Sequence, residues 1–60
     1  EQREYFTFFR SYHTAFRMLS PRTRLELYDA LCMYMFYGQE VELSKIARSH
    51  WELIKPTLDS

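Results

Sequence analysis

The stretch ALCMYMFYG, residues 30–38, decides how this sequence folds. Eight consecutive side chains, from Ala30 to Tyr37, are apolar or aromatic, so a helix formed here has no polar face. A membrane-spanning helix needs about 20 apolar residues, and this shorter run is bracketed by Asp29 and Glu40. The stretch therefore predicts a helix with one face in a core and a second apolar face behind it.

Both ends of this helix are marked in the sequence. Ser20 is a favoured N-cap residue, and Pro21 suits the first helical position because proline lacks the N–H that would be unpaired there. Gly38 is typical of the position just past a helix end. These residues predict a helix over 21–37.

A helix is also predicted before this one. Apolar side chains recur at helical spacing between Phe8 and Leu19, which predicts a helix over about 9–19. Residues 1–6 are expected to be frayed or extended, with Phe6 docking on the core.

A third helix is predicted over about 44–58. Ser44 is its N-cap, and Pro56 either kinks it or ends it. One side of this helix gathers Ile46, Ala47, His50, Trp51, Leu53, Ile54 and Leu58. Since no stretch alternates with the period of a strand, the sequence predicts an all-α fold, a small three-helix bundle in one domain over residues 1–60.

The middle helix is predicted to use its two faces differently. Its core side gathers Leu25, Leu27, Tyr28, Leu31, Cys32, Met35 and Phe36. The opposite side carries Ala30, Met33 and Tyr37 at spacings of three and four. Exposed apolar stripes mark contacts, so we expect this one to bind another copy or another protein, with Tyr34 and Trp51 at its rim. Alternatively, the N-terminal residues or a part of the protein outside this sequence cover the stripe.

Composition limits the class of protein. Eight basic and eight acidic residues give a net charge of zero, whereas modules that neutralise phosphates usually carry a positive excess. Cys32 is the only cysteine, so no intramolecular disulfide can form, and a lone thiol fits a reducing cytoplasm. The sequence starts without methionine or a signal peptide, which predicts a fragment of a longer cytoplasmic chain.

Catalytic patterns are nearly absent. A single glycine excludes a phosphate-cradling loop, and Cys32, His13 and His50 share no metal-ligand spacing. His50 is expected to be a core residue satisfied by a tyrosine hydroxyl or a backbone carbonyl, in preference to a metal or catalytic role. We therefore expect no enzyme, no cofactor, no metal and no small-molecule substrate.

Basic residues give an alternative function. A DNA-binding accessory domain would use Arg17, Arg22, Arg24, Lys45 and Arg48, near the first interhelical turn and on the third helix. A helix-turn-helix needs a turn of three or four residues, and GQEVEL, residues 38–43, is longer. Nucleic acid is therefore a possible partner but not the favoured one.

Four segments carry a resemblance to a known family: YFTFFRSY (5–12), RLELYDAL (24–31), YGQEVEL (37–43) and LIKPTLD (53–59). They resemble an uncharacterised N-terminal domain of phages and prophages, found in proteins similar to phage replisome organisers. Val41 stands where that family often has proline, and Trp51 where it has a smaller aromatic residue.

The resemblance implies a compact helical module without catalytic residues, and a link to phage DNA replication through the longer proteins. Together with the residue patterns, it leads us to expect a non-enzymatic interaction or self-assembly module.

Overall fold

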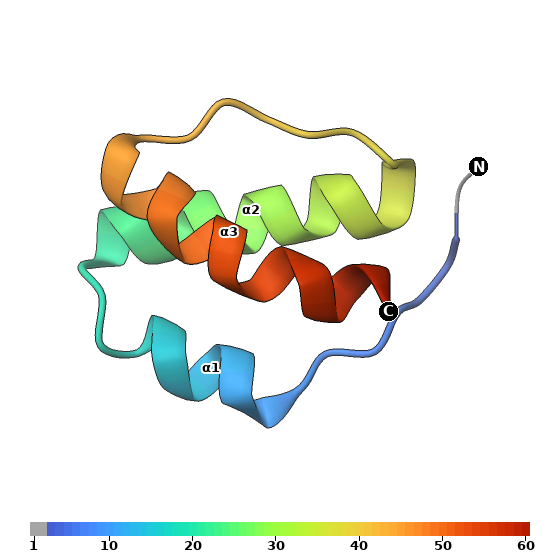
Figure 1. Cartoon of the computed structure of the whole chain (residues 1–60), viewed down its shortest axis with the longest axis horizontal. Helices are drawn as coiled ribbons and strands as arrows, with labels where there is room; N and C mark the ends of the chain where they lie inside the picture. The colour runs from blue at the N-terminus through green and yellow to red at the C-terminus, as the bar shows by residue number, and fades with distance from the viewer. Residues whose placement is uncertain (1–2) are drawn as a thin grey trace.

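The chain folds into three α-helices, as Figure 1 shows. The computed structural model describes residues 3–60, so the expectation for residues 1 and 2 lies outside it. The helices are α1 (Arg10–Phe16), α2 (Pro21–Tyr37) and α3 (Lys45–Asp59), and residues 3–60 contain no strand. This architecture confirms the predicted all-α three-helix bundle.

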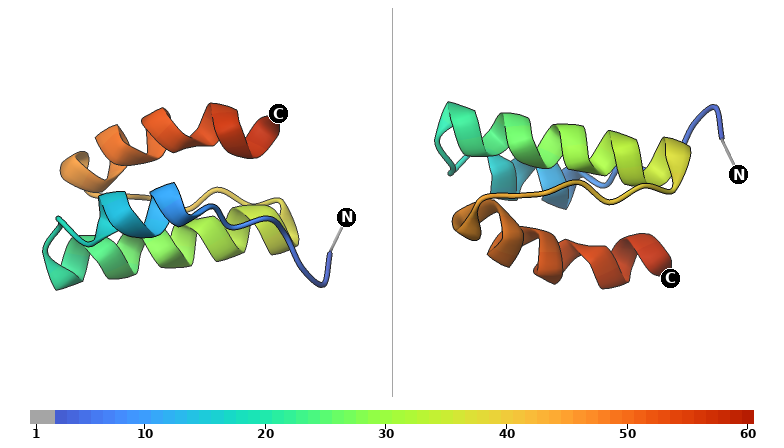
Figure 2. Two further views of the ribbon diagram at one scale, coloured as in Figure 1. Left: turned by 90° about the horizontal axis from the view of Figure 1, so that it is seen from below. Right: turned by 90° about the horizontal axis from the view of Figure 1, so that it is seen from above.

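Helices α2 and α3 run in the same direction, and α1 runs opposite to them (Figures 1 and 2). Residues 38–44 make this possible, because they return along the length of α2 before α3 begins (Figure 2). The connection is therefore not the tight turn of a helix-turn-helix.

The ends of α2 follow the prediction. The Ser20 Oγ accepts a hydrogen bond from the Thr23 N–H at 3.3 Å, which caps the first turn. At the other end Gly38 adopts a left-handed conformation, with φ +69°, and its N–H donates to the Tyr34 carbonyl at 2.9 Å. Glycine adopts this conformation without the steric cost of a Cβ, so it ends the helix.

Helix α1 is shorter than predicted. It ends at Phe16 because the next N–H groups bond to the carbonyl three residues earlier, as in a 3₁₀-helix. The Met18 N–H donates to the Ala15 carbonyl at 3.3 Å, and the Leu19 N–H donates to the Phe16 carbonyl at 3.0 Å. Ser20 is extended, as a residue before proline prefers. The chain therefore leaves the helix before Leu19, and Ala15 is exposed.

Helix α3 continues through Pro56 as one helix to Asp59. Its N-cap is Ser44, whose Oγ accepts from the Ala47 N–H at 3.4 Å. Proline has no N–H, so the Glu52 carbonyl lacks its usual partner four residues later. Of the two alternatives for Pro56, termination of the helix is wrong.

The core lies between the helices, and Trp51 is its largest fully buried side chain. Its ring meets the Tyr34 ring edge-on, with centroids 5.5 Å apart. The buried apolar residues are Tyr12, Phe16, Leu27, Ala30, Leu31, Ala47 and Trp51. His50 is half-buried beside this core, and its Nδ1 lies 2.9 Å from the Ile46 carbonyl oxygen. The contact with a backbone carbonyl agrees with the expectation for His50, but His50 is not one of the buried core residues, so its expected place in the core is wrong.

The N-terminal segment, residues 3–9, is extended, and its residues contact Tyr28 and Phe36 of α2. The Arg3 N–H donates to the Phe36 carbonyl at 3.3 Å. The Phe6 ring meets the Phe36 ring edge-on at 5.1 Å, and Phe6 packs against the core as expected. Edge-on aromatic contacts stabilise a fold beyond the free energy gained by burying apolar area. The segment is therefore held by ring contacts more than by backbone hydrogen bonds.

Glu26 joins α2 to the start of α3. Its Oε1 accepts from the Ser44 Oγ at 2.7 Å, and its Oε2 accepts from the Ser44 N–H at 3.0 Å. These hydrogen bonds, first that of the side chain and then that of the backbone, lower the pKa of Glu26 below its ordinary value of 4.5.

This contact makes the domain sensitive to acid. A carboxylate whose pKa is lower in the folded state than in the unfolded state stabilises the fold fully at pH values above its pKa in the unfolded state. This stabilisation is lost as the pH falls through the pKa of the carboxylate in the folded state. We expect Glu26→Gln to lower the free energy of unfolding at pH 7 and to reduce its pH dependence below about 4.5. Urea unfolding from pH 7 to pH 3 measures both effects. A variant with the acid dependence of the parent would contradict the assigned role.

Candidate functional site

The stripe predicted as an interface on α2 is turned inward at Ala30 but not along its whole length. Ala30, Met33 and Tyr37 continue from Glu26 at helical spacing. Because Glu26 binds Ser44, this side of α2 is turned toward the start of α3 and the connection before it. Ala30 is only 2% exposed and belongs to the core. The expectation that Ala30 lies on an exposed surface is wrong.

Trp51 is also misplaced by the sequence prediction, since it is 1% exposed at the centre of the core rather than at a rim. Tyr34 is half-buried, and its hydroxyl donates to the Asp59 carboxylate. The Lys55 ammonium lies 5.5 Å from the centroid of the Tyr34 ring and binds Glu40 at 3.1 Å.

Two of the predicted interface residues remain accessible: Met33 is half-buried and Tyr37 is half-exposed. The structure does not join them to Trp51 in one exposed surface, because Trp51 is fully buried.

The second apolar face of α2 exists, but other residues form it. Leu25 is 71% exposed and Cys32 is exposed, although both were expected in the core. Tyr28 and Phe36 are half-buried beside them. Side chains three or four residues apart on a helix are neighbours, so these four residues form one continuous row.

Rings from the N-terminal segment widen this row. Phe8, 42% exposed, stacks on Tyr28 with ring centroids 6.0 Å apart and an interplanar angle of 16°. Phe6 contacts Phe8 at 6.4 Å as well as Phe36. We call the combined surface the outer apolar face; it consists of Phe6, Phe8, Leu25, Tyr28, Cys32 and Phe36.

Two opposite charges lie on the same side of α2. Arg22 precedes Leu25 by three residues, and Asp29 follows it by four. Both are exposed, and neither forms an ion pair with another residue among 3–60. They are therefore available to charges on a partner.

The predicted basic residues gather at one end of the bundle. The end of α1 and the first turns of α2 and α3 lie at the same end of the bundle (Figures 1 and 2), and these elements carry Arg17, Arg22, Arg24, Lys45 and Arg48. Arg48 is paired with Glu52 at 3.4 Å. The carboxylate of Glu26 also lies near this end, against Ser44. The basic end thus has a cationic excess that nearby acidic groups reduce.

Neither a metal centre nor a membrane span is found in the part of the chain that the structure describes. No three side chains of His, Cys, Asp or Glu within residues 3–60 come close enough to hold an ion together. No helix in the same range has the length and apolarity required to cross a bilayer.

The fold and this surface define a small all-α domain with an exposed apolar face on its longest helix. Residues 5–60 match DUF6291, a family of unknown function, and the chain belongs to this family. No curated protein and no solved structure matches the chain.

Proposed function

We propose that this domain is a non-enzymatic self-assembly module that binds a second copy through the outer apolar face. The observation that carries the proposal is the exposure of Leu25 and Cys32 next to the stacked rings of Phe8 and Tyr28. Apolar surface in water costs free energy, and association recovers it. Helix α2 positions Leu25, Tyr28 and Cys32 rigidly, so little conformational entropy of these side chains' backbone is lost on binding.

The charges beside the outer apolar face favour a second copy as the partner. In a twofold dimer the same surface meets itself. In the sequence, Leu25 and Glu26 lie midway between Arg22 and Asp29. If two α2 helices pack antiparallel with the twofold axis beside Leu25, Arg22 of each copy therefore lies opposite Asp29 of the other. The net charge of zero adds no overall repulsion between copies.

Substitution of Leu25 tests the proposal. We expect Leu25→Glu to weaken self-association at least about tenfold, because an interface core excludes unpaired charge. Helicity should persist, since Leu25 is 71% exposed. Leu53→Glu is the matched control: Leu53 is 77% exposed on α3 and lies outside the outer apolar face. Sedimentation velocity over a wide concentration range, with circular dichroism, measures both properties.

Charge reversal tests the antiparallel arrangement within the same experiment. Arg22→Asp and Asp29→Arg should each weaken the dimer, and the double variant should restore it. A monomeric parent at every concentration would overturn self-assembly. Equal effects of Leu25→Glu and Leu53→Glu would overturn the choice of surface.

Nucleic-acid binding at the basic end is the second candidate function. Its support is the convergence of Arg17, Arg22, Arg24, Lys45 and Arg48 at the end where α2 and α3 begin (Figure 1). Helix N-termini also attract phosphate. The pairing of Arg48 with Glu52 weakens this candidate, because a neutralised side chain releases fewer counterions from DNA.

A fluorescence anisotropy titration with labelled duplex and single-stranded DNA tests this second candidate. Binding through the basic end should weaken steeply as salt rises, and Arg24→Gln should reduce the salt dependence by about one phosphate contact. Arg10→Gln, on α1 away from this end, is the control. Absence of binding at low salt would remove the candidate.

The proposal also includes a cytoplasmic location and a link to phage DNA replication. A cytoplasmic location rests on the single thiol of Cys32. A link to phage DNA replication rests on the resemblance of the four sequence segments to the phage and prophage domain. The self-assembly experiment does not depend on either.

A further inference from the structure

The turn between α1 and α2, residues 17–20, lies at one end of the molecule (Figures 1 and 2). Met18, in this turn, is 85% exposed, more than any other large apolar side chain of residues 3–60. It has apolar neighbours along the chain: Pro21 is exposed at the start of α2, and Leu25 is 71% exposed one helical turn later. This end of the molecule therefore presents several apolar side chains to water, whereas apolar residues that are exposed singly need no partner.

Arginines alternate with these apolar residues. Arg17 precedes Met18, and Arg22 and Arg24 lie between Pro21 and Leu25. None of the three arginines forms an ion pair with another residue among 3–60. We call this group the turn tip; it consists of Arg17, Met18, Pro21, Arg22, Arg24 and Leu25.

The acidic residues toward this end lie outside the turn tip, since residues 17–25 contain no Asp or Glu. Glu26 follows Leu25, but its carboxylate is held against Ser44 at the start of α3. Asp29 lies one helical turn further along α2, and Glu42 lies in the connection before α3. The turn tip itself is therefore purely cationic.

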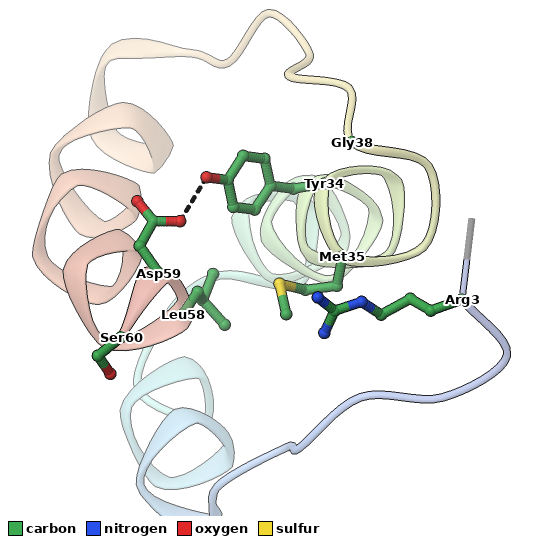
Figure 3. Close-up of a pocket in the computed structure, with 7 residues that line it drawn as sticks. All are labelled: Arg3, Tyr34, Met35, Gly38, Leu58, Asp59 and Ser60. Atoms are coloured by element: carbon green, nitrogen blue, oxygen red, sulfur yellow. Dashed lines mark hydrogen bonds between the residues drawn. The ribbon is translucent and has the colours of Figure 1, made fainter. Parts of the chain in front are cut away.

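Two other acidic groups are engaged at the opposite end of the bundle, where α2 and α3 end (Figure 1). The Asp59 carboxylate accepts a hydrogen bond from the Tyr34 hydroxyl (Figure 3). The Glu40 carboxylate binds the Lys55 ammonium at 3.1 Å. The net charge of zero is thus unevenly distributed, and the turn tip carries positive charge that these groups do not offset locally.

An anionic lipid surface complements both properties of the turn tip. Guanidinium groups bind the phosphates of lipid headgroups, and basic residues near a membrane surface are attracted by its negative potential. Apolar side chains that enter the boundary between headgroups and acyl chains add to this attraction. DNA offers the same phosphates, but its backbone gains nothing from the exposure of Met18 and Leu25. The combination therefore favours lipid over nucleic acid.

We propose that the turn tip binds the surface of an anionic membrane. Arg17, Arg22 and Arg24 contact headgroup phosphates, and Met18 enters the boundary beneath them. A contact of this kind needs no helix that crosses the bilayer. Arg22 and Leu25 also take part in the proposed dimer. Arg17, Met18 and Arg24 do not, so their substitution tests lipid binding independently of self-assembly.

Cosedimentation with lipid vesicles tests the proposal. We expect the domain to bind vesicles of phosphatidylcholine and phosphatidylglycerol in equal amounts, to bind less as salt rises, and to bind phosphatidylcholine alone weakly. The double variant Arg17→Gln, Arg24→Gln should weaken binding to the anionic vesicles at least about tenfold. Leu53→Ser is the control: it removes an exposed leucine of α3 outside the turn tip and should bind like the parent.

Met18→Ser separates a lipid surface from other polyanions. The variant should keep the helicity of the parent, because Met18 is exposed, and should bind the anionic vesicles at least about threefold more weakly. Its binding to a labelled DNA duplex should equal that of the parent. Unchanged vesicle binding by Met18→Ser would show that the arginines act alone and would overturn the proposal. Equal binding of the parent to neutral vesicles, no binding to anionic vesicles at low salt, or tighter binding to DNA at equal phosphate concentration would overturn it as well.

Discussion

The packing of α3 onto α2 around Trp51 is the contact on which the rest of the structure depends. Trp51 is the largest fully buried side chain, and Tyr34 meets its ring edge-on. The hydrogen bonds from Ser44 to Glu26 hold the first turn of α3 against the same helix. These contacts fix the rotation of α2 about its axis, so Ala30 points inward while Leu25 and Cys32 point outward.

Local signals in the sequence predict the helices well, because Ser20, Gly38 and Ser44 act through their own backbone neighbours. The inward face of α2 could not be predicted in the same way. Residues 30–37 are apolar on every side, so periodicity does not distinguish core from surface. Glu26 binds Ser44, the N-cap residue of α3, from 18 residues away in the sequence, and no local pattern reveals such a partner.

The two candidate functions use adjoining surfaces that share Arg22, which faces Asp29 of the other copy in the proposed dimer and also belongs to the basic end. In our proposal self-assembly would use the outer apolar face, and the alternative, nucleic-acid binding, would use the basic end. Substitutions in one of these regions need not disturb the others when they lie more than about 7–10 Å apart. Membership of DUF6291 adds the family but no activity, so the surfaces themselves carry the functional argument.

The rate at which a thiol reagent modifies Cys32, measured over a range of protein concentrations, tests the central claim most directly. The thiol is exposed on the outer apolar face, so modification of the dilute domain should be nearly as fast as in urea. It should slow as the concentration rises and a second copy covers this face. Strong protection in the dilute domain would place Cys32 in the core, and a fast rate at every concentration would show that no copy covers it. Either result would contradict the account.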